Sequence, residues 1–266
     1  MKYIDRSLGT ALQVTHDIFP VVTLTGPRQS GKTTLCRHMY PDMPYINFEN
    51  VQTGLLFNDN PVGFIDSFSN GVIIDEAQRE PSVFRALQTV VDEDRHIGRN
   101  RKFIITGSSN FSIMANSSES MAGRTAPLTL LPLSVNEILQ NRKDDISTNE
   151  LMYLGGYPQI WTSPIKAAEI ILQSYIDTYV ERDLRQLMNI KDLNKFIKFL
   201  GLCAGRVGTE LNRSSLAVET GVTVATIDSW LSVLEASYVI WMLPPWSTNI
   251  NKRLTKSSKL YFCDTG

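Results

Sequence analysis

The stretch VVTLTGPRQSGKTTL, Val21 to Leu35, decides the fold of this 266-residue chain. It begins with a short β-branched run typical of a buried parallel strand and continues into the spacing G-x-x-x-x-G-K-T. The residues after Lys32 predict a helix that Pro41 terminates. Strand, glycine-rich loop and helix N-terminus in this order direct backbone N–H groups and a positive dipole toward an anion. The stretch therefore predicts a phosphate-binding loop for a nucleotide.

The residues of this loop have separate predicted roles. We expect Lys32 to neutralise the β- and γ-phosphate oxygens and the Thr33 hydroxyl to bind Mg²⁺. The nucleotide is taken to be ATP. The full set of residues predicted to contact it is Gly26, Pro27, Arg28, Gln29, Ser30, Gly31, Lys32, Thr33 and Thr34.

A second run, GVIIDEAQRE, predicts hydrolysis in addition to binding. Asp75 and Glu76 follow the apolar strand residues after Gly71. An acid at the end of a buried parallel strand is expected to hold Mg²⁺, and the adjacent Glu76 is expected to orient or deprotonate the attacking water. The alternative is a solvent-exposed acidic pair that caps the following helix.

A third strand is predicted in RKFIITGSSN, over Phe103–Thr106. In P-loop proteins with a catalytic glutamate, a strand between the two motif strands ends in a polar residue near the γ-phosphate. Ser108 is our candidate for this residue, with Ser109 and Asn110 as competitors. The alternative is that GSSN is only a turn.

Arg124 precedes another apolar run, Ala126–Leu131, which is expected to form a fifth strand. An arginine there is a candidate to stabilise charge on the γ-phosphate of its own subunit or of a neighbour. The alternatives are a plain surface charge and an ion pair with Glu119.

Two further elements are predicted, a strand over MPYINFEN and a helix that begins at Pro81. With them, strands and helices alternate from residue 20 to about 140. We therefore predict an α/β fold: a P-loop NTPase parallel sheet of the catalytic-glutamate, AAA+-like type with helices on both faces. The predicted ATPase domain covers residues 1–142. The polar segment NRKDDISTNE then leads to a second domain, residues 150–266, which is helical and ends in a winged helix.

The winged-helix prediction rests on residues 214–263. A helix over Ser214–Thr220, a turn at Gly221 and a helix from Thr223 to Glu235 are followed by strands over Tyr238–Leu243 and Lys259–Cys263.

The charges weaken DNA as a partner for this segment. Residues 214–251 contain no Lys or Arg, so the second helix offers no cation to phosphates. A basic wing is limited to Lys252, Arg253, Lys256 and Lys259. We expect a lid-like or interaction role in preference to reading of a DNA groove. The charge-dense run YVERDLRQL, at residues 179–187, is explained by a solvated helix face.

The composition is that of an ordinary globular protein, with 42% apolar and 20% charged residues. No apolar run reaches the length of a membrane span or a signal peptide, and membrane binding is not expected. The three cysteines, Cys36, Cys203 and Cys263, suit a reducing cytoplasm and offer neither a disulfide framework nor a zinc site. Lys and Arg number 16 against 21 Asp and Glu in residues 1–184, and 10 against 6 in residues 185–266.

The ordered motifs TLTGPRQSGKTTL, VIIDEAQ, ITGSSN, AGRTAPLTLLPLSVNE, GGYP, YVERDL and LYFCDTG resemble a prokaryotic family of predicted ATPases of the AAA+ superfamily. The family carries an AAA-type domain followed by a C-terminal domain of unknown function. The resemblance implies ATP at Gly26–Thr33, metal and water handling by Asp75 and Glu76, sensing near Ser108 and a basic residue at Arg124. Family members continue beyond LYFCDTG into a nuclease-like α/β domain, so we expect this chain to stop at the opening of that domain.

These observations predict a cytoplasmic, Mg²⁺-dependent ATPase whose turnover drives or regulates a conformational change. The catalytic residues are expected to be Glu76, Lys32, Ser108 and Arg124, and the metal ligands Thr33 and Asp75. Two alternatives stay open: an ATP-binding switch without turnover, and an ATP-dependent DNA-binding regulator. An unidentified protein partner and a homo-oligomer are both compatible with the sequence.

Overall fold

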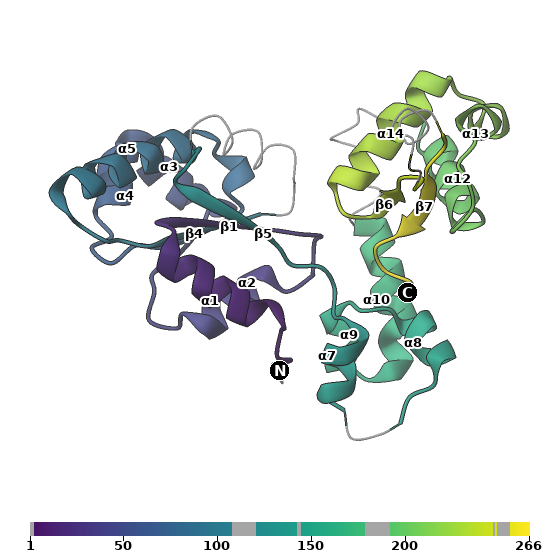
Figure 1. Cartoon of the computed structure of the whole chain (residues 1–266), viewed down its shortest axis with the longest axis horizontal. Helices are drawn as coiled ribbons and strands as arrows, with labels where there is room; N and C mark the ends of the chain where they lie inside the picture. The colour runs from purple at the N-terminus through teal and green to yellow at the C-terminus, as the bar shows by residue number, and fades with distance from the viewer. Residues whose placement is uncertain (1–2, 108–120, 143–144, 179–191, 247, 249–255) are drawn as a thin grey trace. The chain divides into compact units, whose positions relative to one another are not determined.

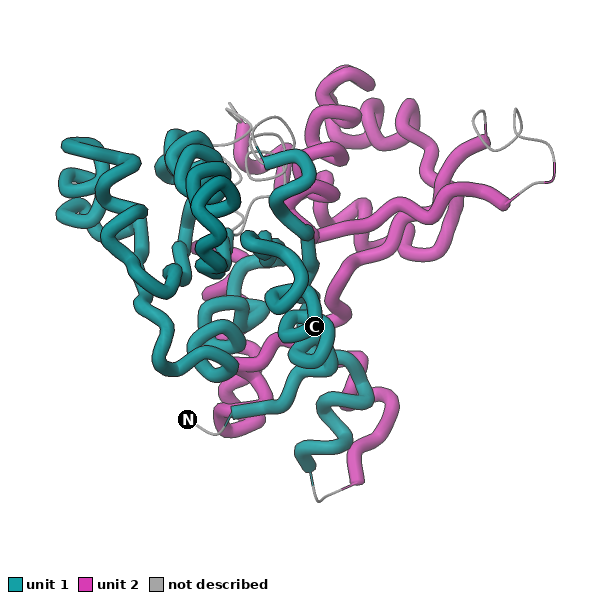
Figure 2. The backbone as a smooth tube through the Cα atoms, turned by 60° about the vertical axis from the view of Figure 1, so that its left-hand side comes forward, with its two compact units in different colours: residues 1–143 teal, residues 144–266 magenta. Residues whose placement is uncertain are grey.

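The computed structural model describes residues 3–107, 121–142, 145–178, 192–246, 248 and 256–266 (Figure 1). The chain divides into two compact units, residues 1–143 and residues 144–266 (Figure 2).

The first unit is built on a five-stranded sheet in which every pairing is parallel. The spatial order is β2-β3-β4-β1-β5. The strands are β1 (Val21–Thr25), β2 (Tyr45–Asn47), β3 (Ile73–Asp75), β4 (Phe103–Thr106) and β5 (Thr125–Thr129). The parallel P-loop sheet is confirmed, with β4 lying between the two motif strands β1 and β3.

Helices cover both faces of this sheet (Figure 1). Side chains alternate between the faces along each strand. Val22 and Leu24 therefore pack with α1 (Leu8–Ile18) and α2 (Lys32–Met39). Val21 packs in a second core on the other face, with α3 (Val51–Asp59), α4 (Pro61–Asp66) and α5 (Ser82–Ile97). Because both faces are covered, a ligand can reach polar side chains at the strand ends, where the loops lie.

The sequence did not predict α1, α3 or α4. In α3 the apolar side chains of Val51, Leu55 and Leu56 are exposed, and Phe57 alone is buried. A helix of this kind has no continuous apolar stripe, so its period cannot be read from hydrophobicity. Its start depends instead on the Asn50 side chain, which accepts a hydrogen bond from the backbone N–H of Gln52.

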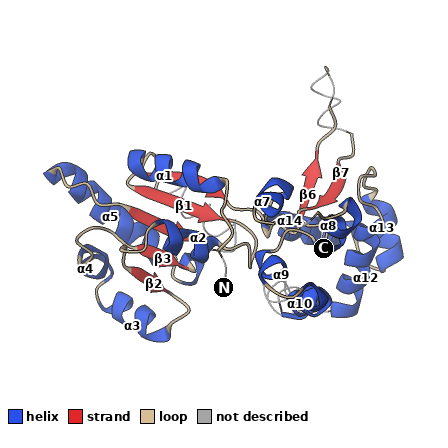
Figure 3. Ribbon diagram, turned by 90° about the horizontal axis from the view of Figure 1, so that it is seen from below, coloured by secondary structure: helices blue, strands red, loops and turns tan. Residues whose placement is uncertain are grey.

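The first unit ends with α7 (Val135–Gln140), which begins with a capping box formed by Ser134 and Glu137. In the second unit, α8 (Thr148–Leu154), α9 (Pro158–Thr162) and α10 (Ala168–Tyr175) precede α12 (Leu193–Ala204), α13 (Arg213–Thr220) and α14 (Val224–Ala236). Strands β6 (Ile240–Leu243) and β7 (Lys259–Phe262) form an antiparallel pair (Figure 3).

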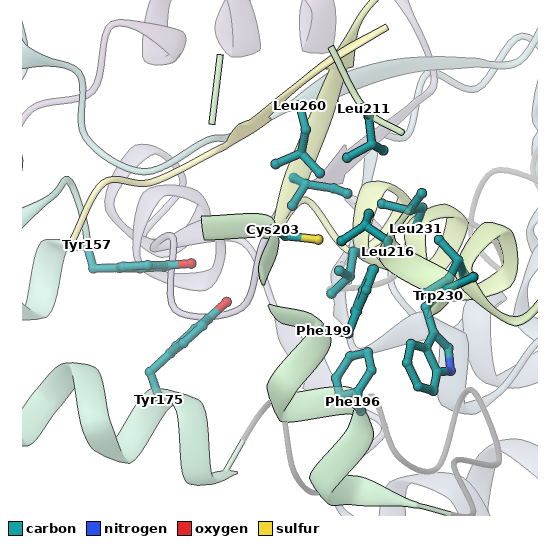
Figure 4. Packing of buried hydrophobic residues seen from close by; sticks show 14 of the residues in the cluster. Tyr157, Tyr175, Phe196, Phe199, Cys203, Leu211, Leu216, Trp230, Leu231 and Leu260 are labelled. Atoms are coloured by element: carbon teal, nitrogen blue, oxygen red, sulfur yellow. The ribbon is translucent and has the colours of Figure 1, made fainter. Parts of the chain in front are cut away.

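Aromatic packing organises the second core. The ring of Trp230, on α14, lies with its centroid 5.2 Å from those of both Phe196 and Phe199, on α12 (Figure 4). Tyr157 and Tyr175 form a second aromatic contact at 4.7 Å. The first contacts join α14 to α12, and the second joins the start of α9 to α10.

The two helices and two strands predicted at residues 214–263 are present. Gly221 ends α13 in a left-handed conformation with φ 73°, as its predicted turn requires. The winged-helix interpretation of this arrangement stays a prediction. The charge-dense segment at residues 179–187 lies outside the described residues.

None of the helices that the structure describes is both long enough and apolar enough to cross a membrane.

A substitution at Gly71 tests the close approach of the segments that precede β3 and β4. Its φ is +95°, and a Cβ placed there would lie 1.7 Å from the carbonyl oxygen of Lys102. Gly71→Ala should therefore lower the free energy of unfolding by about 2–4 kcal/mol, from strain and overpacking together. Urea denaturation measures this change.

The matched control is Gly54→Ala, in the interior of α3, where an added Cβ meets nothing within 4 Å. That substitution should leave stability unchanged or raise it by up to about 1 kcal/mol. Equal unfolding midpoints for the two variants would contradict the close approach at Gly71.

Candidate functional site

The loop between β1 and α2 is shaped by a close backbone approach. Gly26 has φ +146°, and a Cβ there would lie 2.2 Å from the carbonyl oxygen of Leu130. The loop thus turns directly against the segment after β5, which no larger residue permits. In the predicted contact set, Gly26, Pro27, Ser30 and Lys32 are buried; Arg28, Gly31 and Thr33 are half-buried; Gln29 and Thr34 are exposed.

Lys32 lies inside this loop with only 7% of its surface exposed. Its Nζ donates hydrogen bonds to the carbonyl oxygens of Gly26 (3.0 Å) and Pro27 (2.7 Å). Burial lowers the pKa of Lys32 to about 8, although Glu76 and Asp75 oppose this shift. A buried ammonium that binds only carbonyls is suited to exchange them for an anion of higher charge.

Ser30 carries an unsatisfied polar atom at the same loop. Its Oγ is buried and has no hydrogen-bond partner among the described residues. A buried hydroxyl without a partner costs about 1–3 kcal/mol, which a ligand oxygen would offset. Ser30 and Lys32 together fit a bound phosphate group.

Asp75 is the centre of a hydroxyl cluster at the end of β3. Its Oδ2 accepts hydrogen bonds from Thr33 Oγ1 (2.7 Å) and from the Tyr45 hydroxyl (2.8 Å). Its Oδ1 accepts from Thr106 Oγ1 and from the backbone N–H of Glu76, the latter at 3.0 Å. The structure therefore brings together Thr33 and Asp75, the two residues predicted to hold Mg²⁺.

Sequence reasoning missed Tyr45 and Thr106. Both fit the apolar or β-branched pattern of their strands and were assigned only to it. The signal that identifies them is positional. Strands β2 and β4 both flank β3. Thr106 ends β4 beside the Asp75 carboxylate, whereas Tyr45 begins β2 and reaches the carboxylate with its long side chain.

Glu76 adopts a backbone conformation that is unusual for its residue type. Its φ is 54°, in the left-handed region, which costs a residue with a Cβ about 1–2 kcal/mol. The carboxylate accepts a hydrogen bond from Gln78 Nε2. Burial raises the pKa of Glu76, and the neighbouring charge of Asp75 raises it further. The strain and the raised pKa are both typical of a general base.

Arg124 lies at the opposite edge of the sheet. It precedes β5, and Thr125 pairs with Val21 at the start of β1, whereas the phosphate-binding loop follows Thr25. Five residues of strand separate the two edges by roughly 16 Å. The role of Arg124 at the γ-phosphate of its own subunit or of a neighbour stays a prediction.

The ion pair of Arg124 differs from the one suggested by the sequence. Its guanidinium forms two hydrogen bonds to the carboxylate of Asp92 on α5, at 2.6 and 2.8 Å. Glu119, the suggested partner, lies outside the described residues, as do Ser108, Ser109 and Asn110.

Two arginines near the predicted winged helix are paired with carboxylates, which does not favour DNA as a partner. Arg213, at the start of α13, pairs with Asp228 of α14 at 2.8 Å. Arg206 pairs with Glu219 at 2.6 Å. Lys256 and Lys259 are exposed, and Lys252 and Arg253 lie outside the described residues.

Two domain families match the chain. Residues 19–139 match an AAA domain, and residues 146–266 match a Domain of unknown function (DUF8612). Uncharacterized proteins of Mycobacterium bovis and Mycobacterium tuberculosis are each 34% identical over 250 residues, which cover 93% of this chain and 55% of the relative. The chain spans about half the length of the curated relatives it matches. The resemblance to an AAA-type domain followed by a domain of unknown function is thereby confirmed.

Solved structures support the fold. The Walker-type ATPase paby2304 of Pyrococcus abyssi is similar with a TM-score of 0.65 and 15% identity, over 99% of this chain and 94% of that chain. The RuvB Holliday junction branch migration motor of Thermotoga maritima is similar with a TM-score of 0.42 and 17% identity, over 96% of both chains. The first comparison shows a shared fold, and the second is too distant to carry an argument.

The burial of Lys32 predicts a pH dependence of phosphate binding. A bound phosphate stabilises the ammonium, so a chain whose Lys32 is neutral has to take up a proton on binding ADP. Because the pKa of Lys32 is lowered to about 8, ADP affinity should fall above that pH, by up to about tenfold per pH unit. Calorimetry at pH 9 in two buffers of different ionisation enthalpy should show net proton uptake.

Lys32→Arg is the matched control because guanidinium stays protonated throughout this range. Proton uptake that is equal in wild type and Lys32→Arg would contradict the assignment to Lys32.

Proposed function

Since this chain carries an AAA domain followed by a domain of unknown function, we propose that it binds ATP with Mg²⁺ and hydrolyses it. The observation that carries the proposal is the contact between Thr33 and Asp75 beside the buried Lys32. An ammonium, a hydroxyl and a carboxylate meet there at the N-terminus of α2, which is the combination that a metal-bound polyphosphate requires.

In this proposal the phosphates displace the loop carbonyls from Lys32. Its Nζ leaves the Gly26 and Pro27 oxygens and binds phosphate oxygens instead, while Ser30 and the loop amides hold the remaining oxygens. Thr33 and Asp75 would hold Mg²⁺, with the Asp75 carboxylate exchanging hydroxyl donors for the cation or its water. When bound, Mg²⁺ offsets the negative charge that develops on the phosphates.

Glu76 is the proposed general base. It directly follows Asp75, and its left-handed backbone and its contact with Gln78 fix the direction of its carboxylate. A glutamate whose pKa is raised accepts a proton from water more readily than one at its ordinary pKa, provided that it is ionised at the working pH. Turnover is therefore expected to fall in acid, at a pH above the ordinary range of a glutamate.

Glu76→Gln separates hydrolysis from mere binding. The glutamine side chain has the same size as Glu76 but cannot accept the proton of the attacking water. Turnover should therefore fall by about 10²–10⁴-fold while ATP binding is retained. Phosphate release and equilibrium binding of a fluorescent ATP measure the two properties, with Lys32→Ala as the variant that lacks both. Wild-type phosphate release no higher than that of Lys32→Ala, with ATP binding intact, would instead establish a switch without turnover.

We also propose that Arg124 acts on the nucleotide of a neighbouring subunit. The argument is its position: it lies at the sheet edge opposite the phosphate-binding loop, half-buried and held by Asp92. Head-to-tail contacts join two different surfaces of neighbouring subunits, so that edge of one subunit can face the loop of the next.

Mixing two inactive variants tests action between subunits. Arg124→Ala retains Glu76, and Glu76→Gln retains Arg124, so a mixed assembly contains some complete sites. An equal mixture should recover about a quarter of wild-type turnover, the fraction of interfaces that pair the two variants in the productive order. Gel filtration with ATP and Mg²⁺ establishes the assembly, and no recovery in a mixed assembly would exclude this role of Arg124.

A further inference from the structure

Arg6 lies in the segment before α1 and is buried against the phosphate-binding loop, with only 6% of its side chain exposed. Its Nη1 donates a hydrogen bond to the carbonyl oxygen of Ser30 at 2.7 Å. Its Nη2 donates to the carbonyl oxygens of Leu131 (2.5 Å) and Pro132 (3.3 Å), and its Nε pairs with Glu137 Oε1 at 3.3 Å. One guanidinium therefore joins the loop, the segment after β5 and helix α7.

Glu137 fixes the direction of this guanidinium. Its Oε1 also accepts the backbone N–H of Ser7 at 2.6 Å, and its Oε2 accepts that of Ser134 at 2.8 Å. Burial raises the pKa of Glu137, but the Ser134 and Ser7 amides and Arg6 outweigh it, so the pKa is lowered overall. The carboxylate is held ionised and satisfied on both oxygens, as a buried ion pair requires.

The contact with Ser30 has a consequence for the next residue. In a trans peptide the carbonyl oxygen and the following N–H point in opposite directions. When Arg6 holds the Ser30 carbonyl, it directs the Gly31 N–H away from itself. Gly31 immediately precedes Lys32, so its N–H belongs to the amides that must converge on the β-phosphate.

We propose that Arg6 is a positioning residue that orients the Ser30–Gly31 peptide of the phosphate-binding loop. The proposal rests on nucleotide binding at that loop, and it adds a residue that the loop motif does not contain. Arg6 does not touch the ligand. It acts through the peptide plane, and Glu137 and the two carbonyls after β5 hold it in place.

A residue that only stabilises the fold would be expected to affect all ligands alike, whereas one that orients a loop amide affects the β-phosphate in particular. ADP and AMP differ by that phosphate. Arg6→Ala should lower ADP affinity by about tenfold, because the Gly31 N–H would lose its charge-assisted hydrogen bond to the β-phosphate. AMP affinity should change less than about twofold. Arg6→Lys keeps one cation without the fork and should give an intermediate loss for ADP.

The experiment is competition of ADP and AMP against a fluorescent ADP, at a temperature well below the unfolding transition of every variant. Arg99→Ala is the matched control because it removes a half-exposed arginine that pairs with Asp66 at 3.7 Å and Asp94 at 3.8 Å. It should leave both affinities at the wild-type level. If Arg6→Ala does not fold, the ratio of ADP to AMP affinity in Arg6→Lys decides the question.

The outcomes separate two failures. If the wild-type protein binds ADP no better than the Lys32→Ala variant does, nucleotide binding at the loop is overturned, and this proposal with it. If the wild-type protein binds ADP but the Arg6 variants keep its ratio of ADP to AMP affinity, only the role of Arg6 is overturned. A selective loss for ADP that is absent in Arg99→Ala supports it.

Discussion

The first unit depends on one constraint, which is that the buried carboxylate of Asp75 needs donors on both oxygens. The residue is 4% exposed at the carboxyl end of β3, between β2 and β4. Its donors come from α2 (Thr33), from β2 (Tyr45), from β4 (Thr106) and from the following peptide. Leaving such a group unsatisfied costs several kcal/mol, so β2, β4 and α2 are held in register at this point. The donor set that stabilises the fold also positions the residues proposed to act on ATP.

The sequence predicts the residues that identify themselves by motif and spacing. Lys32 lies in the loop motif that follows β1, and Asp75 ends the apolar run of β3. Tyr45 and Thr106 contribute to the same site, but their identity is also what an ordinary strand requires. Their role appears only after β2 and β4 are known to flank β3. Arg6 is harder still, because a single arginine before a weakly amphipathic helix gives no signal of its buried contacts.

The two edges of the sheet carry different chemistry, and the parallel arrangement is the reason. All five strands point the same way, so the loops that follow them gather at one edge and the residues that precede them gather at the other. Lys32, Asp75 and Glu76 lie at the first edge. Arg124, with its partner Asp92, lies at the second. This position is why we propose that Arg124 acts on a neighbour, and motif spacing along one chain does not show which end of the sheet a residue occupies.

The charges at the first edge argue that nucleotide and cation enter together. Lys32 and the half-buried Arg28 supply two positive charges, and Asp75 and Glu76 supply two negative charges within their electrostatic reach. Such a set is balanced by itself, so a bare polyphosphate would add several uncompensated negative charges to a poorly solvated site. Burial and the charge of Asp75 already raise the pKa of Glu76, and added negative charge would raise it further. In the proposed site, a divalent cation bound to the phosphates would oppose that rise in the pKa of Glu76. Asp75 and Thr33 would hold this cation, and Asp75 would then exchange its hydroxyl donors for a more strongly charged partner.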